Sequence, residues 1–367
     1  MSLTAGIVGL PNVGKSTLFN AITRSQVEAA NYPFATIQPN VGIVEVPDKR
    51  LDTLKEMVHP KKNIPTTFEF TDIAGLVKGA SKGEGLGNQF LANIREVDAI
   101  CHVVRCFDDA DITHVDGAVD PVRDAETIMY ELIFADLDVV EKRIAKVQRK
   151  AESNKDKEAI AEMAVLKKLY DVLFSGNPAR GLELTKDEYL IARNYNLLTI
   201  KPMIYVANMG EESVSDPESN THYQQLKQLA DMEHCDVIAI CAKLECEIAQ
   251  LEEEDRAMFL EDLGMDQSGL DKLIFAAYHM LDLGTYFTIG VDENRAWTFR
   301  KGMTAPECAG IIHTDFQKGF IRAECFSYDD FVACGSEAAV KEAGKFRLEG
   351  KDYIVQDGDI LHFRFNV

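Results

Sequence analysis

The feature that most constrains the fold is the stretch GLPNVGKST, which runs from Gly9 to Thr17. It matches the spacing GxxxxGK[ST] between the apolar run AGIVGL, expected as a strand, and an expected helix. In this context the glycines let backbone N–H groups turn inward around phosphates at a helix N-terminus. Lys15 would then reach the β- and γ-phosphates, and the Ser16 hydroxyl would bind Mg²⁺. The sequence therefore predicts a nucleotide-phosphate site built from Asn12, Val13, Gly14, Lys15, Ser16 and Thr17.

A second motif, DIAG from Asp72 to Gly75, follows the apolar stretch TTFEF and resembles the DxxG switch of GTPases. We expect Asp72 to hold the metal through water and the Gly75 N–H to sense the γ-phosphate. Between the two motifs, NYPFATIQPNVG is rich in turn formers, as a switch loop should be. Thr36 in this stretch is the candidate for a second hydroxyl on Mg²⁺, with a plain loop threonine as the alternative.

Apolar runs and amphipathic stretches alternate along much of the chain. TTFEFTDIAG and AICHVVRCF read as strands, and KPMIYVAN and DVIAICAK continue the series after residue 200. This alternation predicts an α/β fold with a doubly wound, mainly parallel sheet, formed by residues 1–120 and 200–283.

The remaining two parts of the chain have different patterns. Residues 121–199 carry two apolar seams with steps of three and four, separated by the polar break SNKDK. They predict an antiparallel helical hairpin, coiled-coil-like, and its charged outer faces favour a projecting arm over two helices packed on the core. Residues 284–367 read as strands with the helical stretch APECAGIIHTDFQKG between them, which predicts a small α+β domain with its own mixed sheet.

Composition excludes several classes of protein. The net charge is −21, and residues 201–284 alone hold 18 Asp and Glu against 5 Lys and Arg, which argues against a general nucleic-acid coat. No apolar run approaches the ~20 residues of a membrane-spanning helix, and MSLTAGIVGL lacks the basic end of a signal peptide. The eight cysteines form no CxxC pair, which favours free thiols in a reducing compartment. We therefore expect a cytoplasmic protein without a membrane partner.

The stretch VANMGEES bears on the choice of base. A guanine-binding protein would carry Asn-Lys-x-Asp here, whereas this chain has Asn208, Met209 and Glu211. Guanine offers two donors that one aspartate accepts, whereas adenine has an acceptor at N1 that a carboxylate so placed would repel. The Asn208 amide, with donors and an acceptor, can serve either base. The residues favour ATP and leave GTP as the alternative.

The motifs GLPNVGKST, YPFATIQPN, DIAGLVKGAS and NMGE, together with the C-terminal domain, resemble the YchF family, a branch of the Obg-related P-loop proteins. The resemblance covers essentially the whole chain. It implies a preference for ATP, binding to the ribosome (the large subunit or the whole particle), a helical arm, and a C-terminal TGS domain of ubiquitin-like β-grasp type. RNA contact through the TGS domain or the arm is part of this expectation. CAK, from Cys241 to Lys243, corresponds to the SAK element that backs the base, so the backbone of Ala242 is expected beside the nucleotide.

The residues that would drive hydrolysis are less clearly marked. Leu76 stands where Ras-like proteins carry the Gln that orients water, so we expect a slow reaction. In relatives with Pro-Asn in the loop, the Asn helps to bind K⁺, which makes Asn12 a K⁺ candidate; a role in the loop turn is the alternative. His114 is a candidate to orient or deprotonate water, and Phe107 to stack on the base; packing is the alternative for both.

Three functions remain open from the sequence. The favoured one is a slow ATPase that acts as a switch on a ribosomal partner. The second is a non-catalytic module with ATP as a bound structural ligand; Leu76, which cannot orient a water molecule, keeps this alternative open. The third is a GTPase of the ribosome-assembly type, which nucleotide affinities would distinguish.

Overall fold

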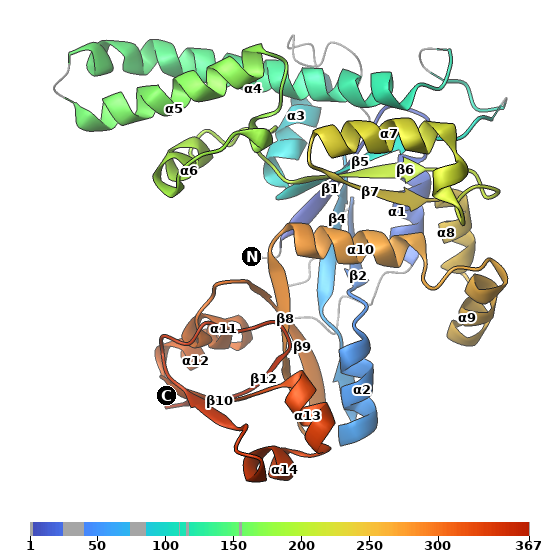
Figure 1. Cartoon of the computed structure of the whole chain (residues 1–367), viewed down its shortest axis with the longest axis vertical. Coiled ribbons are helices and arrows are strands. Elements are labelled where there is room, and N and C mark those ends of the chain that lie inside the picture. The colour runs from blue at the N-terminus through green and yellow to red at the C-terminus, as the bar shows by residue number, and fades with distance from the viewer. Residues whose placement is uncertain are drawn as a thin grey trace. The chain divides into compact units, whose positions relative to one another are not determined.

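The structure is a computed structural model that describes residues 3–24, 40–73, 86–109, 111–114, 117–153 and 156–366. Thr36, Gly75 and Leu76 lie outside the described residues. The chain forms two compact units. The first contains Met1–Ile43 and Glu69–Leu273, and the second contains Val44–Phe68 and Ile274–Val367. Figure 1 names the helices and strands of both units.

The first unit is built on a six-stranded sheet with the order β2-β4-β1-β5-β6-β7. Its strands are β1 (Thr4–Val8), β2 (Val41–Glu45), β4 (Thr67–Asp72), β5 (Ala99–Arg105), β6 (Met203–Asn208) and β7 (Asp236–Ile240). β1 pairs in parallel with β4 and β5, and β6 pairs in parallel with β5 and β7. Every residue of β5 and β6 is buried, as expected for central strands covered on both faces. The predicted α/β fold with a mainly parallel sheet is confirmed.

Apart from the hairpin region, the helices of the first unit are α1 (Lys15–Arg24), α3 (Leu86–Glu96), α7 (Thr221–Met232), α8 (Ala242–Ile248), α9 (Glu253–Asp262) and the start of α10 (Gly269–Met280). α1 packs against α8. Among the helices that the structure describes, none is both long enough and apolar enough to cross a membrane.

The predicted helical hairpin is confirmed as α4 (Pro121–Glu152) and α5 (Lys157–Phe174), followed by α6 (Lys186–Arg193). Asp120 and Asp156 cap the two long helices through their side chains. α4 packs on α5, and Figure 1 shows the pair running side by side beyond the edge of the sheet. The middle of α4 is tied to the segment between α6 and β6, because the Asp136 carboxylate accepts hydrogen bonds from the backbone N–H groups of Leu198 and Thr199, both at 2.8 Å.

The second unit is an α+β structure with a mixed sheet, as predicted. The strand order is β11-β10-β12-β8-β9-β3, with β12 and β8 parallel and β8 and β9 antiparallel. The strands are β3 (Lys62–Ile64), β8 (Leu283–Thr288), β9 (Glu293–Arg300), β10 (Phe320–Ser327), β11 (Arg347–Glu349) and β12 (Asp359–Phe365). The helices are α2 (Lys49–Val58), α11 (Ala305–Ile312), α12 (Thr314–Lys318), α13 (Tyr328–Cys334) and α14 (Glu337–Glu342).

One segment of this unit comes from early in the chain. β3 pairs in parallel with β9, with Lys62 opposite Glu293, and α2 buries Leu51 and Leu54 in a core with Phe287 and Phe326. The prediction that residues 44–68 belong with the rest of residues 1–120 is wrong, because a three-residue strand and a mostly polar helix carry no signal of a partner so far along the chain.

Candidate nucleotide-binding site

The loop between β1 and α1 has the backbone shape that phosphate binding requires. Asn12 and Gly14 both have positive φ, at 62° and 94°. A Cβ on Gly14 would lie 2.2 Å from Asn208 Nδ2, and one on Gly9 would lie 2.5 Å from the carbonyl oxygen of Val103, so only glycine fits at either place. α1 starts at Lys15 and has no acidic residue in its first turn. Its first N–H groups therefore form a cradle for an anion.

Lys15 and Asp72 are electrostatically linked beside this loop. Lys15 is buried and donates a hydrogen bond from Nζ to the carbonyl oxygen of Leu10 at 2.6 Å. Burial lowers the pKa of Lys15 to about 8, and the negative charge of Asp72 opposes this shift. Burial also raises the pKa of Asp72, against the effect of Lys15. Asp72 is in register with Ile7 of β1, which places it at the edge of the sheet from which the phosphate loop departs.

The oxygen atoms at this edge suit Mg²⁺, which prefers oxygen ligands and takes one or two protein groups beside substrate phosphates. Ser16 is exposed at the start of α1, and Asp72 ends β4. Among the described residues, no group of three or more His, Cys, Asp or Glu side chains could hold a metal ion by itself, without a phosphate ligand. The donor set fits a metal that binds together with a nucleotide.

At the other end of the site, Asn208 joins two segments. It is 5% exposed, its Nδ2 donates to the carbonyl oxygen of Val13 at 2.8 Å, and its Oδ1 accepts from Ala242 N–H at 3.0 Å. Met209 is buried. The Glu211 carboxylate forms an ion pair with Lys243, with Nζ and Oε1 2.7 Å apart. Nothing in the sequence pattern around CAK indicates that Lys243 pairs with Glu211.

A cavity of about 720 Å³ opens at the carboxyl ends of the parallel strands, where ligands of such folds bind. Its lining includes ten predicted residues: Asn12, Gly14, Lys15, Ser16, Thr17, Phe107, Asn208, Met209, Glu211 and Ala242. Val13 is buried and takes part through its carbonyl oxygen. Asp108, Asp109, Ile112, Gly210, Glu212, Cys241 and Lys243 also line the cavity. Asp108, Asp109, Gly210 and Glu212 follow predicted strands within four residues, and Cys241 and Lys243 lie at the end of the run DVIAICAK; these positions were the signal that could have identified them.

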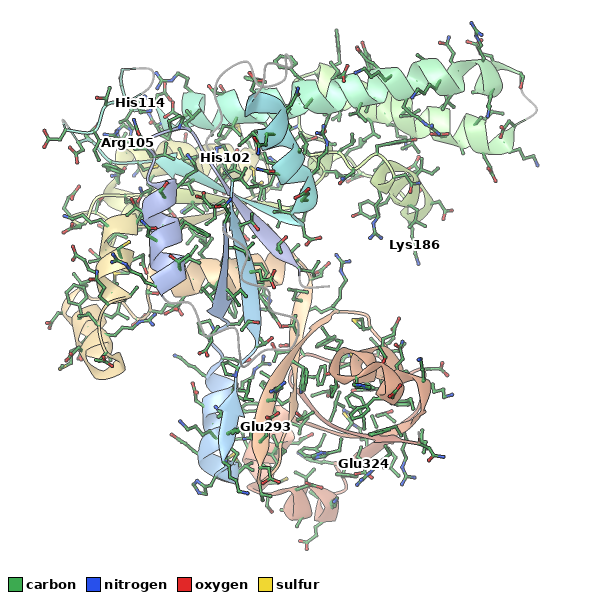
Figure 2. All side chains as sticks on the ribbon, turned by 180° about the vertical axis from the view of Figure 1, so that it is seen from behind. His102, Arg105, His114, Lys186, Glu293 and Glu324 are labelled. Atoms are coloured by element: carbon green, nitrogen blue, oxygen red, sulfur yellow. The ribbon has the colours of Figure 1, made fainter. Side chains whose placement is uncertain are left out.

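The segment after β5 carries two further candidates, Phe107 and His114. Phe107 lines the cavity, and its ring lies 4.6 Å from the Arg105 guanidinium. His114 is buried and outside the cavity lining among the described residues, with Nε2 2.7 Å from Asp124 Oδ2 (Figure 2). Asn12 Nδ2 donates to the carbonyl oxygen of Thr113 at 3.2 Å, so the phosphate loop holds the end of this segment.

A glycine-lysine loop at the start of the first helix, an aspartate at the end of the neighbouring strand and an asparagine bonded to the loop together define a P-loop nucleotide-binding protein. Residues 4–135 match the family described as 50S ribosome-binding GTPase, and residues 283–366 match YchF-GTPase_C, described as a protein of unknown function. The chain belongs to the YchF family.

Full-length relatives support this assignment. The chain is 61% identical to the Ribosome-binding ATPase YchF of Bacillus subtilis (strain 168) over 367 residues, 100% of both chains. It is 53% identical to the protein of the same name from Escherichia coli O157:H7, again over 100% of both. The solved Schizosaccharomyces pombe YchF GTPase is 42% identical, with a TM-score of 0.90 over 99% of this chain and 98% of that chain. The resemblance drawn from the sequence motifs is confirmed.

Proposed function

We propose that this protein binds ATP and, with Mg²⁺, slowly hydrolyses it to ADP as a switch that binds the ribosome. The ion pair between Glu211 and Lys243 is the observation that carries the choice of ATP. Two relatives of the same length are named Ribosome-binding ATPase YchF, which supports both the reaction and the partner.

The base is selected at Glu211 in this proposal. A guanine site needs a carboxylate free to accept from two donors of the base, and here Lys243 holds the carboxylate through Oε1. One N–H of the Asn208 amide donates to the carbonyl oxygen of Val13, and the amide oxygen accepts from Ala242 N–H. The second N–H of the amide can therefore donate to a ring nitrogen that both purines have. Asn208 therefore binds a purine without choosing between them, and the engaged Glu211 removes the advantage of guanine.

The phosphates would bind at the helix N-terminus. Lys15 would exchange the carbonyl oxygen of Leu10 for β- and γ-phosphate oxygens. Ser16 and Thr36 would supply hydroxyls to Mg²⁺, Asp72 would hold it through water, and the Gly75 N–H would sense the γ-phosphate. Bound Mg²⁺ would neutralise charge on the phosphate oxygens.

His114 is our proposed group for orienting the attacking water. The contact between His114 Nε2 and Asp124 Oδ2 at 2.7 Å holds the orientation of the ring. Because the ring does not line the cavity in the described structure, this role requires residues 111–114 to shift when nucleotide binds. The His114→Ala variant should bind ATP normally and hydrolyse it slowly in a single turnover; an unchanged single-turnover rate would remove His114 from the mechanism.

Asn12 is our proposed K⁺ ligand, on the basis of the family resemblance. Turnover compared in KCl and NaCl at equal ionic strength tests it. Equal rates in the two salts would contradict this role.

The first test is a titration of fluorescent ATP and GTP analogues into the Mg²⁺-loaded protein, with Glu211→Asp alongside. Tighter ATP binding followed by release of ADP supports the proposal. Tighter GTP binding would favour a GTPase, and ATP binding without any hydrolysis would favour a non-catalytic module.

The proposed partner is the large ribosomal subunit or the whole ribosome, and the proposed location is the cytoplasm. RNA contact is proposed through the arm α4–α5 or through the C-terminal unit, which we propose to be a TGS domain. Co-sedimentation with purified subunits in ATP and in ADP tests the partner and the switch together: identical binding in both states would contradict a switch.

A further inference from the structure

The guanidinium of Arg105 is almost wholly enclosed at the carboxyl end of β5. The residue is 1% exposed, and its hydrogen bonds reach three carbonyl oxygens: Nε to Phe107 at 3.0 Å, Nη1 to Ile112 at 3.0 Å and Nη2 to Asp109 at 3.1 Å. Among the described residues, no carboxylate forms an ion pair with it. The charge is therefore compensated by the backbone of one short segment and by the face of the Phe107 ring.

This pattern makes the segment depend on the guanidinium. A buried charge is costly unless hydrogen bonds surround it, and the planar fork of an arginine fixes the directions from which they come. Three carbonyl groups from one short segment converge on one side chain. Residues 107–109 and 111–113, which we call the wall segment, must curl around Arg105 to make these bonds.

The wall segment forms one side of the nucleotide cavity through Phe107, Asp108, Asp109 and Ile112. Its start is fixed because Cys106 N–H donates to the carbonyl oxygen of Asn208 at 2.8 Å. Its end is held by Asn12, which donates to the carbonyl oxygen of Thr113. Between these two ends, Arg105 supplies three side-chain hydrogen bonds.

The conformation of the wall segment also sets the positions of two acidic side chains, Asp108 and Asp109, that line the cavity proposed for the anionic nucleotide. Asp109 Oδ1 accepts from Asp111 N–H at 2.8 Å, and Asp108 Oδ2 lies 3.4 Å from His222 Nε2. Both carboxylates are directed at protein groups. A loosened wall segment would release them to repel phosphates.

We propose that Arg105 is a positioning residue of the nucleotide site, whose guanidinium holds the wall segment in the conformation that binds nucleotide. The link to binding rests on the proposed function, whereas the hold on the segment does not.

The test compares Arg105→Lys with Arg180→Lys in the full chain. Lysine keeps the charge of Arg105 but loses the fork that reaches three carbonyls. Arg180 is a matched control, because it is a mostly buried arginine of the same unit that pairs with Glu233 and does not line the cavity. Amide hydrogen exchange is measured in peptides that cover the wall segment and in peptides from β1 and β6, and binding of a fluorescent ATP analogue is titrated.

Arg105→Lys should exchange faster in the wall segment, with β1 and β6 unchanged. It should also bind the ATP analogue roughly tenfold more weakly or worse, since charge-assisted hydrogen bonds are lost. Arg180→Lys should leave both readouts unchanged. In Arg105→Ala, millimolar guanidinium should slow exchange in the wall segment and restore binding of the ATP analogue, whereas ammonium should do neither. This rescue tests the same proposal if the lysine variant does not fold.

Three results would overturn the proposal: exchange that rises equally across the sheet, a loosened wall segment with unchanged affinity, or an alanine variant that guanidinium does not rescue. If the unaltered protein binds neither ATP nor GTP, the proposed function fails. The exchange comparison then still decides whether Arg105 holds the wall segment.

Discussion

The side chain of Asn208 holds the phosphate loop by donating a hydrogen bond from Nδ2 to the carbonyl oxygen of Val13 at 2.8 Å. Its Oδ1 accepts from Ala242 N–H at 3.0 Å, so one amide joins the phosphate loop to the start of α8. Two parts of the cavity lining that are far apart in the sequence are therefore connected through the side chain of Asn208.

Replacing Asn208 with alanine should weaken binding of every purine nucleotide. The change leaves a buried carbonyl and a buried N–H without partners, each worth roughly 1–3 kcal/mol, so affinity should fall about tenfold or more. ATP and GTP analogues should lose affinity to a similar extent, as measured by fluorescence titration. Asn194→Ala, an exposed position directly after α6, is the control. A selective loss of one nucleotide would show that Asn208 discriminates between the bases.

Removing the charge of Lys243 should shift the preference toward GTP. In Lys243→Met the apolar stem is retained, while Glu211 loses the partner that holds its Oε1. The carboxylate then becomes available to the two donors of guanine, and the ratio of GTP to ATP affinity should rise several-fold, within the ~1 kcal/mol that an exposed pair typically contributes. Competition titration of the two nucleotides measures this ratio, and an unchanged ratio would separate Glu211 from base selection.

ATP affinity should fall as the pH rises above about 8, where burial places the pKa of Lys15. Phosphates favour the charged ammonium, so binding raises this pKa, and each pH unit between the free and bound values costs up to about tenfold in affinity. The pKa of Lys243 is raised by its hydrogen bond to Glu211, so that group stays charged in this window. Titrations at constant ionic strength from neutral pH upward test the effect; constant affinity well above pH 8 would contradict it.

The Asp136 carboxylate should be a main source of stability at the root of the arm. It is 1% exposed and also accepts from the Thr199 hydroxyl at 2.7 Å. Asp136→Asn places an amide N–H₂ group opposite these donors and should lower the free energy of unfolding by about 3–5 kcal/mol. The control Asp138→Asn removes only an exposed contact with Lys142 and should change stability by no more than about 0.5 kcal/mol. Hydrogen exchange of α4 and β6 measures both, and equal protection in the two variants would contradict the assignment.

The parts of this molecule that sequence could predict are those encoded locally. The phosphate loop follows from glycines and a lysine at fixed spacing, and β5 and β6 follow from runs that are mostly apolar. Arg105 lies inside such a run, and its role depends on carbonyl groups whose directions no periodicity reveals. His114 illustrates the same limit, because only the fold brings Asp124 to its Nε2.

The segment 44–68 was beyond sequence reasoning for the same reason, and its contribution can be measured. Leu54 of α2 is fully buried with Phe287 and Phe326, so Leu54→Ala should destabilise the second unit by about 2–5 kcal/mol. The protein's one tryptophan, Trp297, lies on β9 of this unit and stacks on Tyr286, so its fluorescence reports the unfolding. Lys55→Ala alters the exposed side of the same helix and should leave the urea midpoint in place. If Leu54→Ala also left that midpoint in place, α2 would not be part of the cooperative core of the second unit.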